Sequence, residues 1–260
     1  MAQFYPLFSS SSGNASYIGT RNEGILIDAG VSCRRMLSAL ACNAIPIRSV
    51  RGIFITHTHS DHVKGLRVLT AKLGVPVMGT AETLRTLEER DALVPGTKTI
   101  PLTEAVTCGG MEICAFPTMH DAPGSCGFRI HTADDQYCAV CTDLGVVTDA
   151  VRHAVHGCDM VLLEANYDPD ILRSGPYPPN LKCRILSEHG HLSNPDSAAF
   201  AQELVRCGTT RILLGHLSRH NNTPALAAKT VQDGLRAFTQ GLDYQLGIAP
   251  AETKGGAVIF

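Results

Sequence analysis

Short apolar runs bounded by polar and turn-forming residues recur along the whole chain. Their length and their richness in β-branched residues are typical of buried strands. We expect strands at residues 24–28, 52–56, 111–116, 127–131, 137–141, 160–164 and 211–215.

Helical spacing of apolar residues appears between several of these runs. We expect helices at residues 31–41, 62–73, 194–206 and 224–238, the third opening on the capping sequence Ser-Asn-Pro-Asp. The early strands follow one another closely, whereas the later strands alternate with helices. This mixture predicts an α/β fold of two face-to-face sheets with helices outside. Residues 1–260 show no internal repeat and are expected to form one domain, with 173–180 as a long irregular surface loop near the functional site.

Composition narrows the class of protein. With 44% hydrophobic residues, the 260-residue chain can bury a sizeable core, and no apolar stretch is long enough to cross a bilayer. Without a visible secretory signal, we expect a cytoplasmic protein with no membrane partner. The net charge of -2 argues against a wide basic nucleic-acid surface, although a local basic rim fits. The ten cysteines are scattered and are expected to be reduced, and the Cys138–Cys141 pair lacks the second pair of a zinc site.

The stretch Thr-His-Thr-His-Ser-Asp-His, residues 56–62, follows the apolar run 52–55 directly. His57 and His59 are two apart and project to the same side of an extended chain. Asp61 and His62 fall at the turn into the next helix and can face a neighbouring point. A solvated polar loop would explain one histidine. The full motif predicts a loop that supplies ligands to two adjacent metal ions.

Three more candidate ligands stand where predicted strands end: His120, Asp143 and His216. Each alone is an ordinary loop residue, but together with the motif they complete a seven-ligand site for two divalent ions. Nitrogen and carboxylate ligands without thiolate suit zinc and also manganese. Two such ions can share a hydroxide, which then serves as the nucleophile in a hydrolysis.

The order Asp28, H-x-H-x-D-H, His120, Asp143, His216 resembles the motif set of the metallo-β-lactamase superfamily. The resemblance implies a four-layer αββα sandwich with the metals in a cleft between the sheet edges. It also implies that Asp28 orients ligating histidines from behind, that Asp143 bridges the ions, and that Asp61 binds one ion and orients the nucleophile.

Further motifs, among them "MHDAPGSCGF", "GPYPPNLKCRI" and "GHLSRHNN", resemble the bacterial YycJ/WalJ subfamily. That resemblance implies a nuclease that degrades double-stranded DNA in the 5′→3′ direction, with nucleic acid as the partner and no protein partner indicated. His191 and Glu164 resemble the histidine–glutamate pair of the ribonuclease Z branch, which protonates the leaving group. A carboxylate on one imidazole nitrogen would leave the other nitrogen free to donate. The plainer interpretation is a histidine beside a helix and a carboxylate at a strand end.

Substrate contacts are expected from two groups of residues. The small-residue turn 9–14 can bring backbone N–H groups near a phosphate, although a flexible hairpin explains it almost as well. Cations and an amide also flank the motifs and are candidate phosphate contacts. The residues singled out are Ser12, Gly13, Asn14, Lys182, Arg184, Arg219 and Asn221.

The sequence therefore predicts a dinuclear metal-dependent phosphodiesterase, with DNA as the expected substrate. One alternative keeps the fold and hydrolyses a small ester, thioester, lactone or cyclic phosphodiester. A second alternative is a metal-binding regulatory module without turnover.

Overall fold

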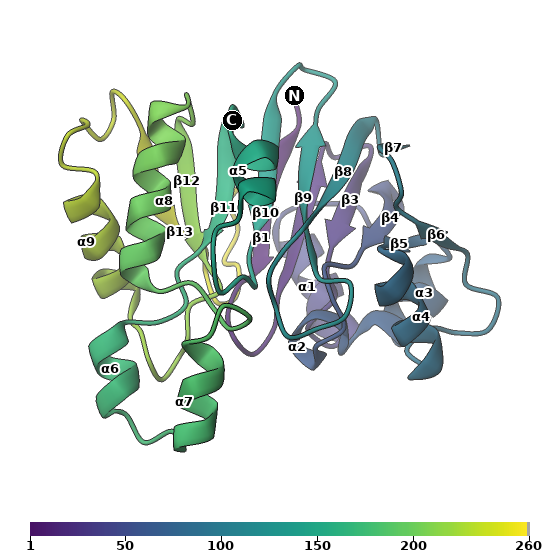
Figure 1. The fold of residues 1–260 in the computed structure, drawn as a ribbon. Coiled ribbons are helices and arrows are strands. Elements are labelled where there is room, and N and C mark those ends of the chain that lie inside the picture. The colour runs from purple at the N-terminus through teal and green to yellow at the C-terminus, as the bar shows by residue number, and fades with distance from the viewer. Residues whose placement is uncertain (259–260) are drawn as a thin grey trace.

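Two mixed β-sheets form the centre of the computed structural model, which describes residues 1–258 (Figure 1). The first sheet has the strand order β1-β2-β3-β4-β5-β6, and the second has the order β13-β12-β11-β10-β9-β8-β7. The strands of the first sheet are β1 Gln3–Phe8, β2 Ala15–Gly19, β3 Gly24–Ile27, β4 Val50–Phe54, β5 Val77–Gly79 and β6 Thr99–Pro101. Those of the second are β7 Val106–Cys108, β8 Met111–Pro117, β9 Cys126–His131, β10 Tyr137–Cys141, β11 Met160–Glu164, β12 Arg211–Gly215 and β13 Gln245–Ile248.

Each sheet changes from antiparallel to parallel pairing along its own length. The strands β1 to β3 pair antiparallel and β3 to β6 pair parallel. The second sheet repeats this arrangement, antiparallel from β7 to β10 and parallel from β10 to β13. The sequence predicted closely spaced strands early in the chain and strands alternating with helices later. In the structure, each half of the chain contains both kinds of strand. The carboxyl ends of neighbouring parallel strands meet at one edge, where loops of this kind usually carry ligands.

Helices cover the outer face of each sheet. Beside the first sheet lie α1 Cys33–Cys42, α3 Leu66–Leu73 and α4 Ala81–Glu89, and beside the second lie α5 Asp149–Val155, α8 Asn194–Arg206 and α9 Pro224–Gly234 (Figure 1). A third buried cluster, including Ile25, Phe54, Phe128 and Leu162, joins the two sheets face to face. This arrangement confirms the predicted four-layer αββα sandwich.

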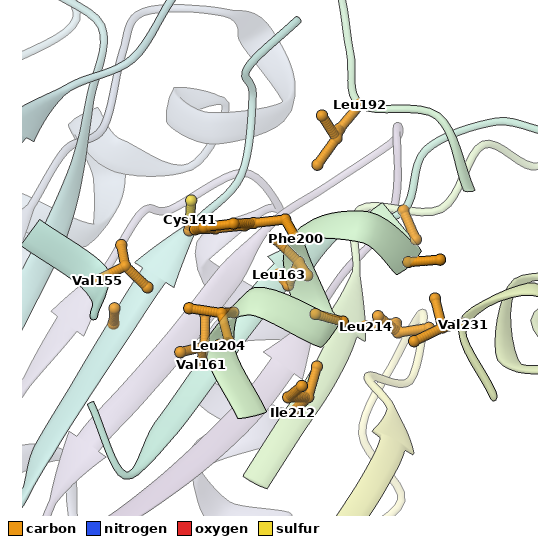
Figure 2. Packing of buried hydrophobic residues seen from close by; sticks show 14 of the residues in the cluster. Cys141, Val155, Val161, Leu163, Leu192, Phe200, Leu204, Ile212, Leu214 and Val231 are labelled. Carbon is orange, nitrogen blue, oxygen red and sulfur yellow. The ribbon is translucent and has the colours of Figure 1, made fainter. Parts of the chain in front are cut away.

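The core beneath α8 shows how the apolar runs divide between two faces. Val161 and Leu163 of β11 point to the helices, where they pack with Phe200 of α8 and Val231 of α9 (Figure 2). Leu162, between them in the chain, belongs to the cluster between the sheets. Both faces of β11 are buried, as is usual for a central parallel strand, and its residues are therefore apolar up to Glu164 at its end.

Two predicted elements are wrong in part. The helix expected at 62–73 is divided into α2 Ser60–Val63 and α3, with Gly65 between them. A Cβ at Gly65 would lie 2.0 Å from the Val31 carbonyl oxygen, so only glycine allows this approach. Half of the segment 173–180 is helical, because α6 Pro169–Ser174 and α7 Pro179–Ile185 leave only four residues between them. A proline begins each of these helices, at the position where its missing N–H costs nothing.

Two other predicted helices have shifted ends: α1 spans Cys33–Cys42 rather than 31–41, and α9 ends at Gly234 rather than at 238. A 3₁₀ turn at Ile47–Ser49 precedes β4.

Among residues 1–258, no helix combines the length and the apolar character that crossing a membrane would require. Cys138 and Cys141 are both free and buried, and burial raises the pKa of each thiol, which does not favour a redox or zinc role.

Candidate metal centre

All seven predicted ligands lie together where strands of the two sheets end. The loop after β4 carries His57, His59, Asp61 and His62, and the loops after β8, β10 and β12 carry His120, Asp143 and His216. Their ligand atoms fall into overlapping groups whose members lie within 4.8 Å of one another. The helix α2, which begins inside the motif, lies at the same lower edge of the molecule as α6 and α7 (Figure 1).

The first group consists of His57, His59 and His120. The Nδ1 atom of His59 is 3.3 Å from Nε2 of His120. The Nε2 atom of His57 is fully buried and has no hydrogen-bond partner within residues 1–258. A buried nitrogen lone pair without a partner is costly unless a ligand satisfies it, so this group fits a cation.

The second group consists of Asp61, His62 and His216. The Oδ2 atom of Asp61 lies 3.5 Å from Nε2 of His62 and 3.5 Å from Nε2 of His216. Two imidazole nitrogens therefore face one carboxylate at separations suited to shared coordination of one ion.

Asp143 lies between the two groups. Its Oδ2 atom is 3.4 Å from Nε2 of His62, and its Oδ1 atom is 3.7 Å from Nε2 of His120. The side chain is buried, and Oδ2 makes no hydrogen bond within the described part of the chain. Oδ1 also lies 3.3 Å from Nδ1 of His216 in the second group, so the Asp143 carboxylate contacts members of both groups.

Carboxylates hold two of the ligating histidines from behind. Asp28 Oδ2 lies 2.7 Å from Nδ1 of His62, and Glu164 Oε1 lies 2.8 Å from Nδ1 of His216. An acceptor at Nδ1 places the ring proton there and leaves Nε2 with a free lone pair. Asp28 also accepts hydrogen bonds from the backbone and hydroxyl of Thr56, so its own orientation is fixed.

The other three histidines have partners of different kinds. Nδ1 of His120 donates to the Gly190 carbonyl at 2.9 Å, and Nδ1 of His57 lies 3.1 Å from the Thr56 hydroxyl. The Nε2 atom of His59 lies 3.5 Å from Oδ1 of Asp121. All five rings are therefore oriented with one nitrogen towards the cluster and the other towards a supporting group.

Glu164 has a wider role than the one expected from the sequence. Its buried Oε1 atom is 2.8 Å from Nδ1 of both His191 and His216. Its Oε2 atom accepts from the backbone N–H groups of Leu144 and Leu192, both at 3.1 Å. Burial raises the pKa of Glu164, but the two histidines outweigh it and hold the pKa well below its usual range. Glu164 thus orients a candidate ligand as well as the predicted proton donor.

Backbone strain accompanies three of the strand-end residues. Asp28, Asp143 and His216 have φ angles of 62°, 60° and 54°, in the left-handed region that residues other than glycine avoid. Each follows a parallel strand of its sheet, where the chain turns sharply. Strain of this kind persists only where the surroundings hold it, and it is concentrated at functional sites.

The charges of the cluster favour a bound cation. Burial lowers the pKa of His57 well below its ordinary value. Burial also opposes the charged form of His62 and His216, but nearby carboxylates, Asp143 first among them, raise both pKa values, that of His216 to about 10. The negative surroundings therefore attract positive charge. Divalent metal ions fit this site for three reasons. Buried lone-pair atoms of His57 and Asp143 have no hydrogen-bond partner within residues 1–258, the ligand atoms are nitrogen and oxygen, and the local potential is negative.

The candidate substrate contacts in the turn 9–14 separate in the structure. Asn14 is buried, and its amide donates to Asp61 at 3.2 Å and lies 3.0 Å from Nε2 of His62, so it belongs to the edge of the metal centre. Gly13 is also buried, and a Cβ there would lie 2.5 Å from Val31. Ser12 is exposed.

The later candidates differ in accessibility. Asn221 is only 1% exposed, which does not favour a contact with a substrate phosphate. The Lys182 amine donates to the Arg173 carbonyl at 2.6 Å, and Arg219 is exposed. Arg184 lines a cavity of about 240 Å³ together with His191.

The cavity-lining residues that the sequence did not single out include three that could contact a substrate: Asp121, Asn166 and Tyr177. Asp121 directly follows a candidate ligand, which was an available signal. Tyr177 reaches the cavity from the segment between α6 and α7, and Asn166 reaches it from the loop after β11.

Comparison with known proteins defines the class. The family model described as a β-lactamase superfamily domain matches residues 23–217. This range includes every candidate metal ligand, and the chain belongs to the metallo-β-lactamase superfamily. The predicted fold family is thereby confirmed.

Particular relatives refine the comparison. The chain is 34% identical over 253 residues to the exodeoxyribonuclease YycJ of Bacillus anthracis, covering 96% of each protein. It is 38% identical to the exodeoxyribonuclease WalJ of Streptococcus pneumoniae serotype 2, covering 91% of this chain and 89% of the relative. Its fold is similar to that of the metallo-β-lactamase fold protein YhfI from Bacillus subtilis, with a TM-score of 0.74 at 18% identity and 97% coverage of both chains. The chain is thus a hydrolase of this superfamily, similar to the YycJ and WalJ proteins, as its motifs indicated.

Proposed function

We propose that this hydrolase is a dinuclear metal-dependent DNA exonuclease, acting as one domain over residues 1–260. The observation that carries the proposal is the buried carboxylate of Asp143 between two histidine-containing groups. The identity to two exodeoxyribonucleases over nine-tenths of the chain supports DNA as the substrate. The cytoplasm, where bacterial DNA lies, is the proposed location.

Seven residues would hold the two ions. His57, His59 and His120 would bind one, Asp61, His62 and His216 the other, and Asp143 would bind both. When bound, such ions lower the pKa of water and stabilise charge on the attacking and leaving oxygens of a phosphodiester. Zinc or manganese suits the nitrogen and oxygen ligands. Asp61, 22% exposed and held by the Asn14 amide, is positioned to accept a hydrogen bond from the attacking water.

His191 is the proposed proton donor to the leaving group. Its Nδ1 atom is held by Glu164 at 2.8 Å, which leaves Nε2 free to carry a proton towards the cavity that this residue lines. The side chain is 20% exposed, more than that of His120 or His216, so a substrate can reach it. A carboxylate behind an imidazole stabilises its protonated form, as a general acid requires.

End-labelled DNA tests the activity and its direction together. Duplex DNA labelled at the 5′ end should release the label at once as a mononucleotide, while a 3′ label should pass through progressively shorter fragments, as 5′→3′ degradation requires. Both reactions should need manganese or zinc and should stop with chelator. Asp143→Ala, prepared in parallel, serves as the control for a contaminating nuclease.

Further substrates decide between this function and its alternatives. Single-stranded DNA, RNA, a cyclic phosphodiester and small esters should be cleaved more slowly than duplex DNA. Faster hydrolysis of an ester or lactone would replace the proposed function by the small-molecule alternative. Metal-dependent binding of DNA without any cleavage would instead support a regulatory module.

A further inference from the structure

The side chain of Asp121 contacts both the candidate metal centre and the guanidinium of Arg184, which lies far along the chain in α7. Asp121 follows His120 in the chain, and its Oδ1 atom lies 3.5 Å from Nε2 of His59 and 3.4 Å from Nε2 of His120. Its other oxygen, Oδ2, accepts a hydrogen bond from Nε of Arg184 in α7. One carboxylate is thus shared between two candidate ligands and a guanidinium that lies 63 residues further along the chain.

Arg184 retains most of its hydrogen-bonding capacity. Its Nε atom is occupied by Asp121, and neither Nη atom makes a hydrogen bond to another residue in the part of the chain that the structure describes. The side chain is 51% exposed. A guanidinium anchored through Nε has its direction fixed, and the edge formed by the two Nη atoms can bind two oxygens of one phosphate.

The cavity beside Arg184 adjoins the reacting groups. His120 and His191 line it from the metal centre, and Tyr177, Leu181 and Arg184 line it from α7 and the segment before it. Its volume of about 240 Å³ is below the roughly 300–1,000 Å³ of typical ligand pockets. It can therefore take a group no larger than one nucleotide, with a cation and an aromatic ring on the same wall.

Neighbouring cations do not share this arrangement. The Lys182 amine donates to the Arg173 carbonyl, and Arg173 itself is 65% exposed and lies 3.8 Å from Asp170 within its own helix. An exposed ion pair by itself contributes little to stability, about 0–1 kcal/mol. The Asp121–Arg184 pair differs in that it contacts a candidate ligand and lines the cavity that contains His191.

We propose that Arg184 binds the phosphate of the nucleotide next to the scissile bond, and that Asp121 is the positioning residue that aims it. This inference rests on the proposed function, because it requires a nucleic-acid substrate. It adds a substrate contact that depends on nucleotides beyond the reacting phosphodiester. The reacting diester itself is bound at the metal centre and does not need Arg184.

Two substrates separate this contact from the chemistry. Duplex DNA contains the neighbouring phosphate, whereas bis(p-nitrophenyl) phosphate has only the reacting diester. Arg184→Gln should lower kcat/KM on DNA by about 10- to 100-fold, the range of a hydrogen bond to a charged group, mainly by raising KM. It should leave hydrolysis of the aryl diester and the metal content unchanged. Arg173→Gln, the same change on the neighbouring helix, should leave both substrates unaffected.

The role of Asp121 is tested by a cycle of variants. At saturating metal, which offsets the loss of the contact with His59, Asp121→Asn should raise KM for DNA less than Arg184→Gln does, and the double variant should be no worse than Arg184→Gln alone, because Asp121 then acts through Arg184. Arg184→Lys should recover only part of the lost affinity, since an ammonium lacks the fork of N–H groups. The slope of DNA affinity against salt should fall by about one phosphate contact in Arg184→Gln.

Different failures point to different errors. Equal DNA kinetics in Arg184→Gln and Arg173→Gln would refute the contact, as would an equal loss on the aryl diester. Additive effects of the two single variants would refute the positioning role of Asp121. If the unaltered protein hydrolyses the aryl diester but degrades no DNA, the proposed function is wrong and this inference fails with it.

Discussion

Replacing Glu164 by glutamine exchanges one carboxylate oxygen for an NH₂ group. This single change should alter the tautomer of two histidines, His191 and His216. Four N–H donors surround the buried carboxylate: two from backbone amides at Oε2 and two from imidazoles at Oε1. A glutamine amide has one oxygen and one NH₂ group, so two of the four donors must meet another donor. Backbone amides cannot give up their protons, whereas imidazoles can change tautomer. We therefore expect the amide oxygen to face Leu144 and Leu192, and its NH₂ group to face His191 and His216.

The consequence is a wrong tautomer on both rings. An NH₂ group at Nδ1 makes that nitrogen an acceptor and moves the ring proton to Nε2. On His216 the proton then occupies the nitrogen that faces Asp61 at 3.5 Å and would otherwise bind the ion. Loss of such a supporting partner typically costs 10–100-fold in metal affinity. On His191, loss of the protonated form should slow cleavage of DNA by about 10²–10⁴-fold.

Glu164→Gln should therefore show two separable defects. Competition with a chelator should show that one of the two ions is bound with lower affinity. Saturating metal should restore activity on an activated aryl phosphodiester. It should not restore activity on DNA, because the alkoxide that leaves from DNA needs a proton. Glu203→Gln, which alters a carboxylate paired with Arg152, should have neither defect. Unchanged affinity for both ions in Glu164→Gln would show that His216 keeps its tautomer, and that Glu164 supports only His191.

Three further expectations follow from the same geometry. Metal analysis of protein purified without chelator should find two divalent ions. Asp143→Ala should lose both ions, whereas His216→Ala should mainly lose one. Equal loss of a single ion in both variants would argue against a carboxylate shared by the two ions. His191→Ala should be slowed about 10²–10⁴-fold on DNA, stay nearly normal on an activated aryl diester and retain its metals; loss of metal would assign this residue to the metal site. Leu163→Ala in the core beneath α8 should lower the free energy of unfolding by about 2–5 kcal/mol in denaturant titration, whereas Val68→Ala, at a side chain 61% exposed, should change it by less than about 0.5 kcal/mol.

Local sequence determined the central elements and the ligand loop. The strands at 137–141, 160–164 and 211–215 and the helix at 194–206 have the bounds expected from their apolar patterns. In the buried parallel strands both faces are apolar, and the helix begins at a clear cap, so short-range information is enough. The motif at 56–62 is equally local, because neighbouring residues on one loop must supply neighbouring ligands.

The resemblance implied the roles of Asp28 and of the Glu164–His191 pair, but only the tertiary structure showed that Glu164 also supports His216 and that Asp121 pairs with Arg184. Glu164 reaches His191 and His216, which are 27 and 52 residues away, and the Asp121–Arg184 pair spans 63 residues. Such contacts depend on how the two sheets and α7 pack, and the periodicity of a sequence carries information only about neighbours a few residues apart. The helices in 169–185 were missed for a related reason. They pack as a small cluster of their own, and prolines and glycine interrupt the apolar pattern that would otherwise have predicted them.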